Sequence, residues 1–151
     1  MSSAVRDLTQ AGVSIWLDDL SRPLVRTGGL ARLVTETGVV GVTTNPSIFA
    51  TAISAGAGYE DALRAHAAAG DDAARTVHAL TTEDVREAAD VLRPVFEATG
   101  GRDGRVSIEV EPRLAKDADA TVERGEARWA AGDRPNSLVR VPATRAGRRD
   151  G

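Results

Sequence analysis

Five polar residues stand at or just beyond the ends of apolar segments in this 151-residue sequence, where they could carry chemistry. They are Asp18, Thr43, Asn45, Glu109 and Arg140. Carboxylates can transfer protons, and hydroxyl and amide groups can bind hydroxylated ligands. A guanidinium can neutralise a carboxylate or hold an anion. These residue types suit either a catalytic cluster or an ion pair that is purely structural.

Strict alternation between apolar and polar residues in segment 105–110 predicts where Glu109 points. Val106 and Ile108 share one face of the expected strand, so Glu109 points to the other face. Alternation in segment 137–141 places Arg140 on that same polar side. Two interpretations stay open: Arg140 neutralises Asp18 or Glu109 in an inward ion pair, or these groups form a catalytic cluster.

The elements that must position these residues follow from hydrophobic periodicity. Strands are predicted at 13–17 (a buried strand), 39–43, 105–110 and 137–141. Helices are predicted at 4–11, from 21 or 22 to the Gly28-Gly29 pair, and at 30–36, 46–54, 59–69, 72–80, 81–98 and 117–131. Asn45 is a suitable N-cap, with Pro46 in the first turn.

The order β-α-β-α-β-α-β predicts an α/β fold with a parallel sheet and helical crossovers. Both faces of an open doubly wound sheet are covered by helices and should be apolar. A polar face bearing Glu109 and Arg140 instead favours the β/α units of a barrel, whose interior carries a site.

Composition excludes several classes of protein. With 42% apolar and 27% charged residues the chain is an ordinary globular sequence, and its net charge of −3 disfavours nucleic-acid partners. No apolar segment is long enough to span a membrane, and no secretory signal is visible, so we expect a cytoplasmic protein. The absence of cysteine excludes disulfides and thiolate catalysis, and His66 and His78 lack the spacing of metal ligands, so no metal is expected.

Four segments in order resemble the transaldolase family, in particular its longer bacterial members. They are SIWLDDLSR, GVVGVTTNPSIF, GRVSIEVEPRLAKDADATV and RPNSLVRVPAT, and the resemblance covers roughly residues 10–146. It implies a (β/α)8 barrel of the pentose phosphate pathway that moves a dihydroxyacetone unit from sedoheptulose 7-phosphate to glyceraldehyde 3-phosphate. The implied chemistry uses a lysine Schiff base and no metal or organic cofactor.

The resemblance also implies roles for individual residues. Asp18 would handle proton transfer during carbon–carbon cleavage, and Glu109 would act through a water in forming and hydrolysing the imine. Thr43 and Asn45 would hold the substrate hydroxyls.

The sequence departs from the family pattern at the nucleophile. The family's fourth strand carries the Schiff-base lysine just before a Pro-Ala-Thr step, and here that position is Arg140. A guanidinium stays protonated to a pH above about 12 and is not an imine-forming amine. The single lysine of the chain, Lys116, is expected to be a solvated surface charge.

The second departure is length. A complete barrel needs about 250 residues, whereas this sequence ends after its fourth strand. We therefore expect a single partial barrel domain over residues 1–151, with a frayed tail at 145–151 and no transaldolase activity of its own. The alternative is a non-catalytic sugar-phosphate-binding chain, or a half-barrel that self-associates through its unpaired strand edges.

Overall fold

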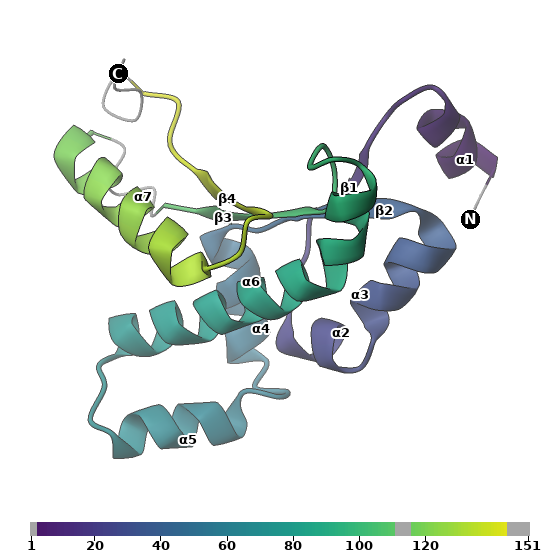
Figure 1. The fold of residues 1–151 in the computed structure, drawn as a ribbon. Coiled ribbons are helices and arrows are strands. Elements are labelled where there is room, and N and C mark those ends of the chain that lie inside the picture. Colours follow the sequence, from purple (N-terminus) through teal and green to yellow (C-terminus); the bar gives the residue numbers. More distant parts are fainter. Residues whose placement is uncertain (1–2, 111–115, 145–151) are drawn as a thin grey trace.

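The computed structural model describes residues 3–110 and 116–144, in which a four-stranded sheet carries its helices mainly on one face (Figure 1). The strands are β1 (Ile15–Leu17), β2 (Val39–Thr43), β3 (Arg105–Glu109) and β4 (Ser137–Arg140). The helices are α1 (Ser3–Gln10), α2 (Arg22–Arg26), α3 (Gly29–Arg32), the π-helical turn η1 (Leu33–Thr37), α4 (Pro46–Ser54), α5 (Glu60–Ala68), α6 (Ala73–Ala98) and α7 (Ala118–Gly132).

The sheet is parallel throughout, and its strands lie side by side in the order β1-β2-β3-β4. Doubly wound sheets reverse their strand order at a switch point, whereas barrel strands follow one another in sequence. The observed order is that of successive β/α units of a barrel, which confirms the predicted parallel β/α architecture.

The core lies between the sheet and helices α2, α3, α4 and α6. Val42 and Val106 are fully buried on the helix-facing side of the sheet, and they meet Leu92 of α6. The opposite face is more open: Thr43 and Glu109 are half-buried and Arg140 is exposed. Burying one such aliphatic side chain stabilises the fold by about 1.5–3 kcal/mol, so the helix-facing side supplies most of the stability.

Helix α6 corrects one prediction, because residues 73–98 form a single helix where two were expected. The Thr81 hydroxyl was expected to cap a new helix, but it donates to the carbonyl of His78 one turn earlier, at 3.1 Å. Thr81 and Thr82 are also buried. A threonine that bonds back into the preceding turn can continue a helix instead of starting one.

The first strand corrects another prediction, because it is shorter and less buried than expected. It begins at Ile15, while Val13 is 45% exposed and donates its N–H to the carbonyl of Leu8 at the end of α1. Ile15, Trp16 and Leu17 are half-buried. The Trp16 ring lies over Gly41 of β2, where any Cβ would overlap it, so only glycine permits this approach.

The other strands and helices fall within a residue or two of the predicted limits. The one helix predicted at 30–36 is formed by α3 (Gly29–Arg32) and the π-helical turn η1 (Leu33–Thr37) that follows it. Strand β2 matches its predicted range, and α4 begins at Pro46 as expected. No described helix is both long and apolar enough to cross a membrane. The predicted frayed tail at 145–151 lies outside the described residues.

Candidate functional site

Three of the five predicted residues meet on the open face of the sheet. Arg140 of β4 donates from Nη1 to the Thr43 hydroxyl of β2 at 2.6 Å, and its Nη2 lies 3.8 Å from a Glu109 carboxylate oxygen of β3. Glu109 and Arg140 are direct register partners. Their side chains are 27% and 50% exposed, so solvent weakens this ion pair. The inward ion pair left open by the sequence is present, with Glu109 as the partner of Arg140.

Strand alternation explains why these side chains converge. In parallel strands held in register, residues on one face form rows across the sheet, and Thr43, Ser107 and Leu138 form one such row. Glu109 and Arg140 form the next row toward the carboxyl ends of the strands. Ligands bind at that end of parallel α/β sheets.

Ser107 belongs to the same face and was not singled out from the sequence. It is 2% exposed, and no described group makes a hydrogen bond to its hydroxyl. Its backbone carbonyl accepts a bond of 2.7 Å from the buried Thr44 hydroxyl, which ties the ends of β2 and β3 together. A buried hydroxyl in the middle of a strand is a signal that only its polar neighbours on the same face could have revealed.

Asn45 caps helix α4, and this role limits the hydrogen bonds that its side chain can make to a ligand. Its side-chain oxygen accepts from the N–H groups of Ser47 and Ile48 at 2.9 and 3.0 Å, and it thereby caps α4. This confirms the predicted N-cap. Because the amide oxygen is engaged in capping, Asn45 can serve a ligand only through its NH2 group.

Asp18 stands apart from the Arg140 cluster. It is exposed in the segment that follows β1. Strand β1 forms one edge of the described sheet, and β4 forms the other. Three strand spacings separate the two edges, or roughly 14 Å. A substrate of several carbons would have to bridge this distance to touch both groups. Nearby, Asp19, Asn45 and Ser47 line a hollow of about 470 Å³.

A buried polar cluster anchors the segment that carries Asp18. Arg22, at the start of α2, is 2% exposed and donates from Nε to Asp84 of α6 at 2.8 Å. Tyr59 donates its hydroxyl to the other Asp84 oxygen at 2.6 Å, and the Arg22 guanidinium lies 4.9 Å from the Tyr59 ring centre. The Arg22 N–H donates to the Tyr59 oxygen at 3.0 Å. This network fixes the chain just beyond Asp18 and Asp19.

Burial dominates the electrostatics of this cluster. It raises the pKa of Asp84 above its ordinary value, although hydrogen bonds from Tyr59 and Arg22 act in the opposite direction. Burial and the bond to Asp84 also raise the pKa of Tyr59. One sequence signal could have indicated this cluster. Arg22 is a cation in the first turn of a helix, where it opposes the helix dipole, so a carboxylate from another element is expected to pair with it.

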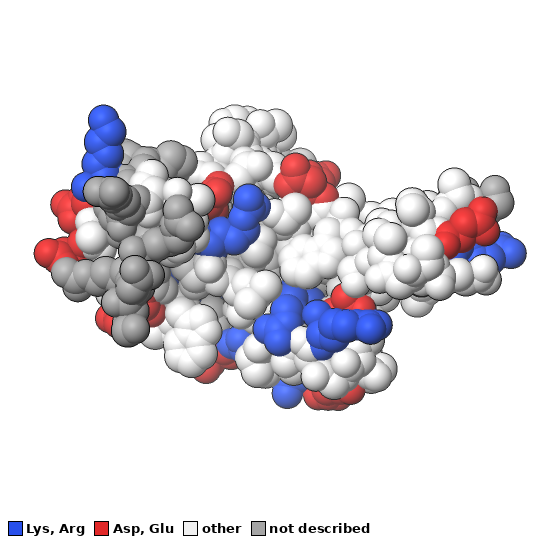
Figure 2. Space-filling model, turned by 90° about the horizontal axis from the view of Figure 1, so that it is seen from above, with Lys and Arg blue, Asp and Glu red and all other residues white. Residues whose placement is uncertain are grey.

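The face of the molecule seen from above carries both signs of charge. Acidic and basic side chains are interspersed there, with uncharged surface between them (Figure 2). Lys116 is exposed just before Asp117, the N-cap of α7, which agrees with the expected surface position. Within residues 3–110 and 116–144, no three His, Asp or Glu side chains are grouped as a metal site would need.

Comparison with known proteins adds sequence similarity to this geometry. The family model "Transaldolase/Fructose-6-phosphate aldolase" matches residues 15–149. Transaldolase 1 of Streptomyces avermitilis is 57% identical over 141 residues, which cover 93% of this chain and 37% of that protein. The transaldolase of Acidothermus cellulolyticus is 54% identical over 144 residues, 95% of this chain and 39% of that protein. The chain thus spans about two fifths of the length of these relatives.

Proposed function

Because the chain belongs to the transaldolase/fructose-6-phosphate aldolase family, we propose that it holds the sugar-phosphate-binding half of a transaldolase site without the imine-forming amine. The ligands would be those of the family resemblance, sedoheptulose 7-phosphate and glyceraldehyde 3-phosphate. The observation that carries the proposal is Arg140, which lies beside Glu109 and Thr43 where the resemblance places the Schiff-base lysine.

The chemistry of the guanidinium decides what this site can do. Imine formation needs a neutral amine that attacks a ketose carbonyl, and a guanidinium stays protonated and delocalised at any pH below about 12. Arg140 would instead donate hydrogen bonds to hydroxyl or carbonyl oxygens of a bound sugar. The bound sugar would replace Thr43 and Glu109 as the partners of the Arg140 guanidinium.

The remaining residues keep roles that do not depend on the amine. Thr43 and the NH2 group of Asn45 lie at the carboxyl end of β2, where they would hold substrate hydroxyls. Glu109 would accept a proton from a hydroxyl or a bound water, and Asp18 would contact the ligand from the β1 edge. The whole arrangement would bind a polyol phosphate without cleaving it.

Reductive trapping tests the proposal because the chain has a single lysine, Lys116. The four chains compared are wild type, K116R, R140K and R140K/K116R, the last of which carries its only lysine at position 140. Each is incubated with sedoheptulose 7-phosphate and borohydride, and intact and peptide masses are measured. We expect no substrate-dependent adduct on wild type or K116R. We expect a reduced seven-carbon adduct on residue 140 of R140K/K116R, because an imine that is reduced before any carbon–carbon bond breaks keeps the whole ketose.

Two results would contradict the proposal. A substrate-dependent adduct on Lys116 of the wild type would show that imine chemistry proceeds at another amine. Failure of R140K/K116R to be trapped would show that position 140 does not face the ketose carbonyl. Thermal melts with sedoheptulose 7-phosphate measure non-covalent binding by the wild type, for which we expect a rise in Tm.

A further inference from the structure

Strands β1 and β4 form the two edges of the sheet, and within residues 3–110 and 116–144 no further strand pairs with either of them (Figure 1). An edge strand presents N–H and C=O groups that another strand can bind. On β4, the carbonyls of Asn136 and Arg140 accept from β3 at 3.0 Å each. Because backbone groups alternate in direction along a strand, the N–H and C=O of Val139 point outward from the sheet.

Large apolar side chains are exposed beside both edges. Next to β4, they are Val141, which follows the strand, and Val122 and Trp129 of α7, the helix that packs on β4. Trp129 is 63% exposed. Next to β1, Leu8 and Val13 precede the strand and are exposed as well. Exposed apolar surface beside an unpaired strand indicates an interaction site.

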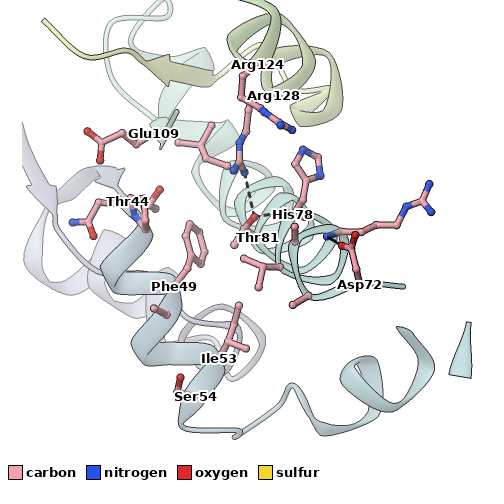
Figure 3. Close-up of a pocket in the computed structure, with 18 residues that line it drawn as sticks. Thr44, Phe49, Ile53, Ser54, Asp72, His78, Thr81, Glu109, Arg124 and Arg128 are labelled. Atoms are coloured by element: carbon pink, nitrogen blue, oxygen red, sulfur yellow. Dashed lines mark hydrogen bonds between the residues drawn. The ribbon is translucent and has the colours of Figure 1, made fainter. Parts of the chain in front are cut away.

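The exposed stripe of α7 borders the β4 edge. Arg128 donates from Nη1 to the Thr81 hydroxyl of α6 at 3.4 Å (Figure 3). Consecutive helix residues point about 100° apart, so Trp129 is turned away from Arg128 and from α6. Trp129 also lies in the last turn of α7, before the chain enters β4 at Ser137. It is therefore level with the amino ends of the strands, where Leu8 and Val13 precede β1.

The carboxyl ends of the two edge strands carry opposite charges. Asp18 and Asp19 follow β1 and are exposed, and neither has an ion-pair partner in the part of the chain that the structure describes. Arg140 ends β4, is half exposed, and lies 3.8 Å from Glu109. A guanidinium has N–H donors on all three of its nitrogens, so Arg140 can bind a second carboxylate while it keeps Glu109.

We propose that two copies of this chain form a closed dimer in which β4 of each copy pairs in parallel with β1 of the other. A two-fold axis along the strands makes the two junctions equivalent. Two four-stranded sheets then give a ring of eight parallel strands, a number that closes a barrel around packed side chains and leaves no edge unpaired. Arg140 would lie beside the partner subunit's Asp18, and Trp129 would pack on the partner subunit's Leu8 and Val13.

The dimer would also complete the site on the open face of the sheet. That face would become the interior of the ring, and the partner subunit's Asp18 would join Arg140 and Glu109, from which Asp18 of the same chain stands apart. This consequence rests on the proposed function, whereas association does not need a sugar. Association is therefore measured without ligand, and the outcome of the reductive trapping does not affect it.

Charge reversal tests which edges meet. D18R and R140D are studied alone and as an equal mixture, by sedimentation velocity over about a hundredfold range of concentration. Each variant alone would place like charges at both junctions, so we expect its dimer to be at least about tenfold weaker than that of wild type. In a mixed dimer both junctions regain opposite charges. We expect the mixture to recover the wild-type affinity, and native mass spectrometry to find the mixed dimer.

Matched variants serve as controls. D61R and R64D make the same reversals at exposed positions on α5, beyond α6 from the sheet, and should dimerise like wild type (Figure 1). W129Q should weaken the dimer about tenfold, whereas V77Q, which changes an exposed apolar residue of α6, should not. Circular dichroism establishes that each variant is folded.

Three results would overturn the proposal. Wild type that stays monomeric throughout the concentration range would show that the edges do not pair. Oligomers that grow beyond two copies would show that the ring does not close. A mixture of folded D18R and R140D that associates no better than either variant alone would show that β4 does not meet β1 of the partner.

Discussion

Arg22 carries a positive charge into the interior with only 2% of its surface exposed, and the balance of its contacts decides whether that helps the fold. Desolvating an arginine and an aspartate costs several kcal/mol per ion, and direct pairing with further hydrogen bonds offsets that cost. Arg22 has Asp84 at 2.8 Å, Glu83 at 2.8 Å and the face of the Tyr59 ring. The cluster is therefore sensitive to loss of either ion and tolerant of milder changes.

Removing the arginine alone should be severe. R22L leaves Asp84, which is fully buried, without its cation, and we expect it to lower the free energy of unfolding by about 3–5 kcal/mol. Y59F removes the hydrogen bond to Asp84 and the acceptor of the Arg22 backbone N–H, and it should cost about 1–3 kcal/mol. Urea denaturation followed by circular dichroism measures both. R22L/D84L should recover part of the loss, and an R22L effect no larger than that of Y59F would show that the pair is not the source of stability.

At the residue scale, the local sequence pattern predicted the cluster of Glu109 and Arg140 on the open face of the sheet. It did not predict that Asp18 lies apart from them. Alternation along one strand is enough to place Glu109 and Arg140 on a common face. The separation of Asp18 depends on which strands lie at the sheet edges, which no local pattern encodes. The buried cluster was missed because Tyr59 and Asp84 lie 37 and 62 residues from Arg22. Only the tertiary packing of the start of α5, which holds Tyr59, and of α6, which holds Asp84, brings them to it.

Among the elements, the turn that leads from α6 into β3 packs most closely. Gly104 has φ +75°, and its N–H donates to the Val40 carbonyl of β2 at 2.6 Å. A Cβ at this position would collide with the backbone of Phe96 near the end of α6. Helix and strand thus approach each other backbone to backbone, which sets the distance between α6 and the sheet.

Alanine at Gly104 should be far more damaging than alanine at a nearby glycine of similar φ. G104A combines left-handed strain with steric overlap, and we expect a loss of at least about 3 kcal/mol. Gly100 has φ +61° with nothing within 4 Å of a built Cβ, so G100A should cost only the strain, about 1–2 kcal/mol. Thermal and urea unfolding of the two variants give the comparison. Similar losses would mean that Phe96 can move aside at little cost.

Element limits were predictable where a specific residue ends the element. Strand β2 lies between Gly38, which has φ +75°, and the capping residue Asn45, and its predicted limits were confirmed. The supposed break at Thr81 was wrong because the threonine signal is ambiguous: the same hydroxyl can cap a new helix or bond back into the old one. Burial against the sheet, which is a tertiary effect, decides between the two.

At the scale of the whole molecule, exposed ion pairs connect α6 to elements on either side of it. Arg134, before β4, contacts Asp90 through two bonds of 2.6 and 3.0 Å, and Arg26 of α2 binds Glu87. These bonds lower the pKa of Asp90 and of Glu87 below their ordinary values of 3.8 and 4.5. The carboxylates are partly exposed, so each pair contributes no more than about 1 kcal/mol.

The lowered pKa values predict how stability changes with pH. The unfolded chain binds protons on these carboxyls at higher pH than the folded chain does, so their stabilisation is complete above about pH 4.5. It is lost as the pH falls through the lower folded-state pKa values. D90N/E87Q removes this part, so the stability difference between wild type and variant should shrink on acidification. Urea denaturation between pH 6 and pH 2.5 measures it, and a constant difference would contradict the assignment.

The sequential strand order has a consequence for how the sheet assembles in time. Each strand pairs with the one preceding it in the chain, so the sheet can grow in the order in which residues leave the ribosome. The segments that connect paired strands differ in length. Strand β2 ends at Thr43 and β3 begins only at Arg105, whereas much shorter segments connect β1 to β2 and β3 to β4. Closing the longest segment has the largest entropic cost, and distant pairings form slowly. We therefore expect docking of β3 onto β2 to be the slowest step in the assembly of this sheet.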